Sequence, residues 1–263
     1  VAQIEADLGA DALAKLLADK SLKKPAALER IWQQFTQHGN ETAYLTHLID
    51  TVGLTAKQID LMSRPGRLGV AAGKELSRRI QAVIDGGIAG GRLRELEGRI
   101  LKSKDNTGHV GELAALERWK LEGAKRARLL PEIEDGHKNP EAIVDGRLKE
   151  VKTTRDGVDA TWLEKKLGDG SKKAHGHAGR TTGASKAKTT LDLEVQVVLK
   201  PGQTLDFAAV DATVRAQFRA GNHTGVGRVR IVALDARFQN PQLIGQWTRG
   251  PDGVISGTKG GTP

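Results

Sequence analysis

Residues 139–152 read Asn-Pro-Glu-Ala-Ile-Val-Asp-Gly-Arg-Leu-Lys-Glu-Val-Lys, and this stretch carries the strongest fold signal in the chain. The Asp-Gly pair at 145–146 lies between two runs that suit β-strands, which is typical of a hairpin with a two-residue turn. Such a turn sets the register outward from itself, so that Glu141 faces Glu150 across the hairpin. Paired residues share a face about 5 Å apart. Because side chains alternate along a strand, Lys152 is expected on that same face.

The hairpin therefore predicts two carboxylates and one ammonium group at its open end. Two carboxylates this close repel each other unless a cation lies between them. Mg²⁺ suits such oxygen ligands, with Mn²⁺ or Zn²⁺ as alternatives. A bound divalent ion would polarise a phosphate and lower the pKa of a bound water. Glu141 and Glu150 are thus the predicted metal ligands, and Lys152 would position the water or stabilise the developing negative charge.

The 263-residue chain divides into three parts by its pattern of apolar residues. Residues 1–100 show helical spacing only. Residues 101–249 mix helical and strand patterns, which indicates an α/β or α+β domain. The tail, 250–263, is rich in Gly, Thr and Pro and is expected to be flexible. Besides the hairpin, the patterns of the middle part predict helices at 110–126 and 206–219 and strands at 191–199 and 226–234.

The composition favours an anionic partner. Lys and Arg number 41 against 32 Asp and Glu, for a formal charge of +9. That charge leaves nucleic acid, a membrane surface and an acidic protein open as partners. No apolar run approaches the ~20 residues that a membrane-spanning helix needs, so no membrane span is expected. The chain has no Cys, so a metal would be held by carboxylates rather than thiolates.

Much of the positive charge gathers in residues 165–190, which hold seven Lys or Arg, five Gly and one acidic residue. This composition predicts a basic loop that clamps the phosphates of a nucleic acid, because backbone contacts dominate nucleic-acid affinity. The predicted clamp consists of Lys172, Lys173, Arg180, Lys186 and Lys188. His175 and His177, in the same stretch, are interpreted as loop residues rather than as zinc ligands.

Two other acidic residues compete with those of the hairpin. Glu164 begins a second Glu-x-Lys motif, but no strand pattern surrounds it, and we interpret it as part of the solvated face of a helix. Asp145 is a rival for the first acidic position of the site. The turn makes it an ordinary turn residue that lies far from Glu150, which favours Glu141 instead.

Residues 140–141 (Pro-Glu) and 150–152 (Glu-Val-Lys) resemble the motif of the PD-(D/E)XK nuclease superfamily. In that superfamily an acid follows a Pro at the start of one strand, and acid-x-Lys lies on the next; here a Glu stands where an Asp is commoner. The family often has a Glu on the preceding helix, and Glu112 is placed for that role, to complete or orient the site. The resemblance covers about residues 105–236 and implies a restriction-endonuclease-like mixed sheet.

Within the superfamily, the chain looks most like the C-terminal toxin domains of contact-dependent growth inhibition systems and related polymorphic toxins. The resemblance implies a metal-dependent endonuclease that is exported as the C-terminal part of a larger surface protein. It would act in the cytoplasm of a target bacterium and be neutralised by a cognate immunity protein. Its substrate would be tRNA or DNA; tRNA is slightly favoured, because one basic loop can hold a compact folded substrate without a dimer. Residues 1–100 would serve as an uptake or linker domain, or contact the immunity protein.

Two other interpretations stay open. The chain could be a non-enzymatic nucleic-acid-binding protein, in which the helices around residues 54–84 dock on DNA and the hairpin is inert. It could also be a structural component of a phage or secretion system that uses a nuclease-like fold without activity. No Gly-x-Ser-x-Gly elbow and no P-loop is present in the sequence, so serine-hydrolase and NTPase functions lack support.

Overall fold

The computed structural model describes residues 2–22, 25–37, 39, 41–64, 67–88, 90–131, 140–181, 189–218, 223–250 and 252–260. The chain forms two compact units. The first comprises Val1–Gly86 with Gly90–Asn106, and the second comprises Thr107–Pro263 with Gly87–Ala89. The hairpin lies in the second unit.

The first unit is helical, as its apolar spacing predicts, and its described residues contain no strand. Its helices are α1 (Ala2–Leu8), α2 (Ala10–Ala18), α3 (Pro25–Gln37), α4 (Thr42–Thr46), the π-helix η1 (His47–Thr51), α5 (Ala56–Met62), α6 (Gly69–Asp85) and α7 (Gly90–Lys102). Side chains at helical spacing, such as Ile31 and Phe35 of α3, are fully buried and form its core. Burial of these stripes is the main source of stability for such short helices.

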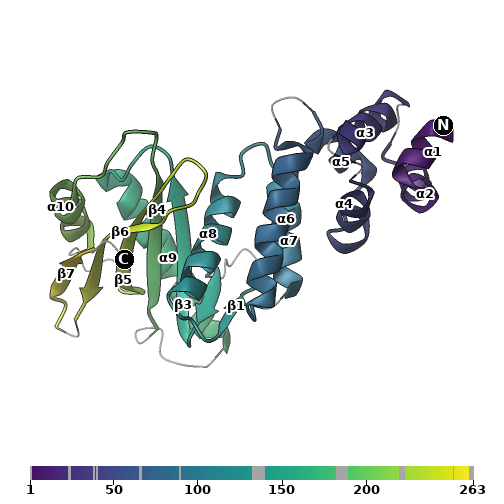
Figure 1. Cartoon of the computed structure of the whole chain (residues 1–263). Coiled ribbons are helices and arrows are strands. Elements are labelled where there is room, and N and C mark those ends of the chain that lie inside the picture. The colour runs from purple at the N-terminus through teal and green to yellow at the C-terminus, as the bar shows by residue number, and fades with distance from the viewer. Residues whose placement is uncertain are drawn as a thin grey trace. The chain divides into compact units, whose positions relative to one another are not determined.

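The second unit is built on a seven-stranded sheet whose strands lie side by side in chain order (Figure 1). Its elements are α8 (Thr107–Leu121), β1 (Ala127–Leu129), β2 (Ala142–Val144), β3 (Arg147–Thr154), α9 (Ala160–Thr181), β4 (Leu191–Val198), α10 (Phe207–Phe218), β5 (Val226–Leu234), β6 (Gln242–Arg249) and β7 (Ile255–Lys259). Strands β3, β4 and β5 are parallel, and the strands on either side of them pair antiparallel. The predicted mixed sheet is confirmed.

The predicted hairpin and its register are also confirmed. Strands β2 and β3 pair antiparallel. Ala142 lies opposite Lys149, Ile143 opposite Leu148 and Val144 opposite Arg147. Asp145 and Gly146 have φ angles of 47° and 80°, the left-handed values that a tight hairpin turn requires. The Asp145 carboxylate accepts a 2.9 Å hydrogen bond from the backbone N–H of Arg126, so this residue holds the turn, as predicted.

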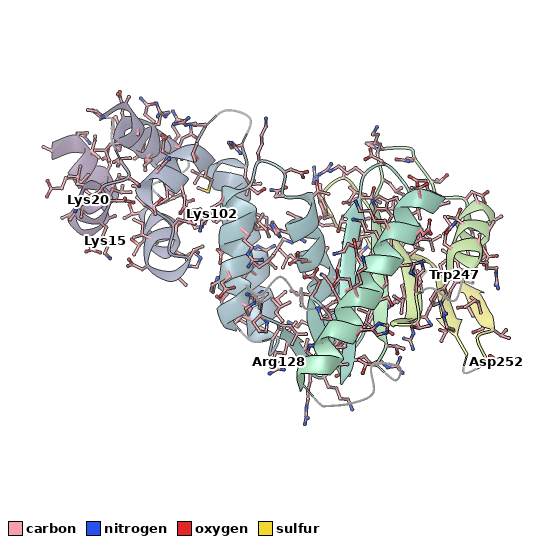
Figure 2. The ribbon with its side chains drawn as sticks, turned by 180° about the vertical axis from the view of Figure 1, so that it is seen from behind. Lys15, Lys20, Lys102, Arg128, Trp247 and Asp252 are labelled. Atoms are coloured by element: carbon pink, nitrogen blue, oxygen red, sulfur yellow. The ribbon has the colours of Figure 1, made fainter. Side chains whose placement is uncertain are left out.

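The two faces of the sheet differ in chemistry. Strand β4 is buried on both faces, which suits a parallel strand covered by helices on each side. Leu193 and Val195 belong to an apolar core with α9 and α10, and Figure 2 shows α9 crossing this face. Glu194 and Gln196 point to the other face, where Arg118 of α8 makes an ion pair with Glu194. The ends of the sheet are marked by Arg128 on β1 and Asp252 between β6 and β7 (Figure 2).

The predicted basic loop at 165–190 is wrong for its first two thirds, because residues 160–181 form helix α9. Leu163, Leu167 and Ala174 lie at helical spacing and are fully buried in the sheet core. This burial outweighs the helix-weakening effect of the interspersed Gly residues, about 1 kcal/mol each. Lys186 and Lys188 of the predicted clamp lie outside the described residues.

Two other boundaries differ from the sequence patterns. The tail predicted as flexible contains β7, which pairs with β6 and buries Ile255 in the core. Helix α8 ends at Leu121 instead of continuing to residue 126. Gly123, with a φ of 84°, stops it, since a glycine in the left-handed region is a common helix terminator.

Gly111 lets α8 approach the sheet closely. A Cβ atom there would meet Thr153 Oγ1 and lie 2.8 Å from Gln196 Oε1. We expect Gly111→Ala to lower the free energy of unfolding by about 1–3 kcal/mol through overpacking. Gly108→Ala on the same helix is the matched control, because nothing lies within 4 Å of its Cβ position. Thermal unfolding followed by circular dichroism measures the difference; equal melting temperatures would show that α8 can move away without cost.

Candidate functional site

The hairpin brings the predicted carboxylates and ammonium group together. Glu150 lies in β3 with a fully buried side chain, and Glu141 stands just before β2 with 24% of its side chain exposed. Lys152, two residues after Glu150, makes an ion pair with Glu150 Oε1. Its Nζ is also 3.5 Å from Glu141 Oε1. The three side chains therefore form one cluster at the open end of the hairpin.

A second ammonium group completes this cluster. Lys173 of α9 places its Nζ 2.5 Å from Glu150 Oε1 and 3.5 Å from Glu141 Oε1. The sequence interpretation assigned Lys173 to a phosphate clamp on a loop, whereas the structure places it on a helix against the carboxylates. The helical spacing of Leu163, Leu167 and Ala174 could have revealed this, because it puts Lys173 beside the sheet-facing stripe.

Glu112 lies on α8, the helix that precedes the hairpin, with 22% of its side chain exposed. Its Oε1 is 3.4 Å from His109 Nδ1. Burial raises the pKa of Glu112, and the charge of Glu141 raises it further, whereas His109 and Lys152 oppose the shift. Glu112 is therefore within electrostatic range of the cluster, on the element predicted for it.

The charges of the cluster depend on one another. Burial, and then the charge of Glu141, raise the pKa of Glu150, while Lys152 and Lys173 oppose this shift. Burial alone would lower the pKa of Lys152, but the carboxylates of Glu150 and Glu141 outweigh it and the pKa is raised. Lys152 is consequently an ammonium group at neutral pH, suited to donate hydrogen bonds and not to accept a proton.

The other sequence candidates whose side chains the structure describes lie outside this cluster. Lys172 is exposed on α9 and Arg180 lies near the end of that helix. His175 and His177 are two positions apart on α9, a spacing at which helical side chains do not face each other. Glu164 is exposed on α9, as its interpretation as a solvated helix residue predicts.

The predicted metal ion requires carboxylate oxygens that are free to bind it. Among the described residues, no three His, Asp or Glu side chains converge into a metal-binding group. The cations that separate Glu141 from Glu150 are instead the two lysine ammonium groups. One buried oxygen, Glu150 Oε2, has no hydrogen-bond partner among the described residues, which costs about 1–3 kcal/mol unless a ligand satisfies it. Glu150 Oε2 and the half-buried Glu141 carboxylate are oxygen ligands of the kind that a divalent cation prefers, so the residues present fit such an ion.

Comparisons of the chain with protein-family models, curated proteins and solved structures find no significant match. The function must therefore be inferred from the residues of the site and their geometry. In the part of the chain that the structure describes, no helix combines the length and apolar character needed to cross a bilayer.

Proposed function

We propose that this chain is a metal-dependent endonuclease of the PD-(D/E)XK type and acts as a toxin on nucleic acid in a target bacterium. The single observation that carries the nuclease proposal is the cluster of buried Glu150 with Glu141 and Lys152. Its members occupy the elements that the resemblance requires: the start of one strand, the next strand and, for Glu112, the preceding helix. The resemblance further supports a nucleic-acid substrate, tRNA or DNA, and a cognate immunity protein as the partner. The slight preference for tRNA rests on a basic loop at 165–190, most of which is helix α9.

Each side chain of the cluster has a definite task in this proposal. Glu141 and Glu150 would hold Mg²⁺, which when bound would supply a Lewis acid for the phosphate and for the attacking water. The Lys152 ammonium group donates hydrogen bonds that orient the attacking water and stabilise negative charge as it develops. Lys173 holds Glu150 Oε1 from the side of α9, which fixes the orientation of that carboxylate. Glu112, on α8, completes or orients the site through its electrostatic interactions with Glu141 and Lys152.

The proposal is tested by giving the purified chain total tRNA and, separately, plasmid DNA in the presence of Mg²⁺. We expect cleavage of one of them that stops when EDTA removes the metal. Mn²⁺ and Zn²⁺ are tested in parallel, since carboxylate sites also accept these ions. If the chain binds nucleic acid but cuts neither substrate with any of the three metals, it is a binding protein and not a nuclease. Growth arrest on expression, relieved by the product of the neighbouring open reading frame, tests the toxin role separately.

A further inference from the structure

A polar cavity lies on the face of the sheet opposite the Glu141–Glu150 cluster, near the closed end of the hairpin. Its volume is about 260 Å³. Four cationic side chains from β3 and β5 line it: Arg147, Lys149, Arg228 and Arg230. None of them belongs to the Glu141–Glu150 cluster, because Lys149 and Glu150 are adjacent on β3 and so point to opposite faces.

The strand register explains why these cations gather. Lys149 pairs with Asp192 of β4, which in turn pairs with Arg228 of β5, so the three form one row across three parallel strands. Lys149 Nζ lies 2.6 Å from Asp192 Oδ2, Arg228 Nη1 lies 3.6 Å away and Arg147 Nη1 lies 3.9 Å away. One carboxylate therefore faces three positive charges.

The two carboxylates that line the cavity, Glu122 and Asp145, already have partners. Glu122 makes a 2.8 Å ion pair with Arg230 and a second one with Arg118. The Asp145 carboxylate accepts hydrogen bonds from the backbone N–H groups of Lys125 and Arg126, just before β1. The cavity lining thus carries more positive than negative charge.

We propose that this cavity binds a phosphate group of the nucleic-acid substrate, away from the bond that is cut. Arg147, Lys149 and Arg228 are its donors, since guanidinium groups present paired N–H donors that match phosphate oxygens. Phosphate contacts of this kind fix the register of a nucleic acid on a protein without reading its sequence. The inference rests on the proposed nuclease function for the identity of the ligand.

Binding of fluorescently labelled tRNA and duplex DNA to the full-length chain in EDTA tests this site. The double variant Arg147→Gln/Arg228→Gln is expected to bind at least about tenfold more weakly, since it loses two charged phosphate contacts. The steepness of log K against log salt should fall by about 1, because the site neutralises one phosphate. Arg128→Gln, which removes an exposed Arg on β1, is the matched control and should leave the affinity within about twofold.

Two outcomes overturn the proposal. The first is that the double variant binds both nucleic acids as tightly as Arg128→Gln does, while circular dichroism shows that it is folded. The second concerns inorganic phosphate, which should displace the nucleic acid from the wild type better than chloride at equal ionic strength; equal displacement excludes a phosphate site. Because EDTA removes catalysis from these measurements, they are independent of the cleavage assay. Failure of cleavage alone therefore overturns the nuclease function, and unchanged binding alone overturns the phosphate site.

Discussion

Replacing Lys152 by Met is expected to lower the rate of nucleic-acid cleavage by at least about 100-fold at saturating Mg²⁺, because removal of one donor to developing negative charge commonly costs that much. The variant should still fold. Lys173 remains paired with Glu150 Oε1 at 2.5 Å, so the buried carboxylate keeps one partner, and Met fills a similar volume. The loss should therefore appear in the rate and not in the melting temperature.

Glu150→Gln should have an effect at least as large, since it removes the charge of a proposed metal ligand while keeping its size. Glu164, which begins the second Glu-x-Lys motif, and its neighbour Lys165 supply matched controls. Glu164→Gln and Lys165→Met make the same chemical changes on the exposed face of α9, and both should keep wild-type rates. The measurement is the initial rate of cleavage of the substrate identified with the wild type. Cleavage that survives both Glu150→Gln and Lys152→Met would place the active site elsewhere.

The largest expected effect on stability comes from Arg118. Its side chain and that of Glu194 are only 6% and 4% exposed, and the two form an ion pair between α8 and β4. Burial, and then the charge of Arg230, lower the pKa of Arg118 to about 10, which leaves it charged at neutral pH. Arg118→Met would leave the Glu194 carboxylate buried with only neutral donors, Trp119 Nε1 and Gln196 Nε2.

We expect Arg118→Met to lower the free energy of unfolding by about 3–5 kcal/mol, the usual cost of removing one partner of a buried ion pair. The melting temperature should fall by about 2–4 °C for each kcal/mol in a protein of this size. The double variant Arg118→Met/Glu194→Met is the control, because replacing both charges by apolar groups is often close to neutral. If the double variant is no more stable than the single one, the ion pair is not the source of the loss.

The amino-acid sequence by itself determined the hairpin and, through it, the association of Glu141, Glu150 and Lys152. The turn depends on two adjacent residues that adopt left-handed φ angles, and the register then follows from alternation along the strands. Strand β5 has the predicted bounds, and β4 and α10 come within a residue of theirs at each end. Their apolar patterns are strong enough to read without knowing what they pack against.

Only the tertiary structure decided helix α9, strands β1 and β6, and the position of Lys173. Strand β1 has three residues, too few to show a pattern. Strand β6 contains Gly245, and a glycine interrupts the apolar pattern by which a strand is predicted. In the structure this glycine leaves room for the Trp247 and Phe207 rings. Helix α9 is rich in Gly and Lys, so its stability comes from burying one apolar stripe against the sheet. That burial involves strands distant in sequence, and the contact between Lys173 and Glu150 exists only because of it.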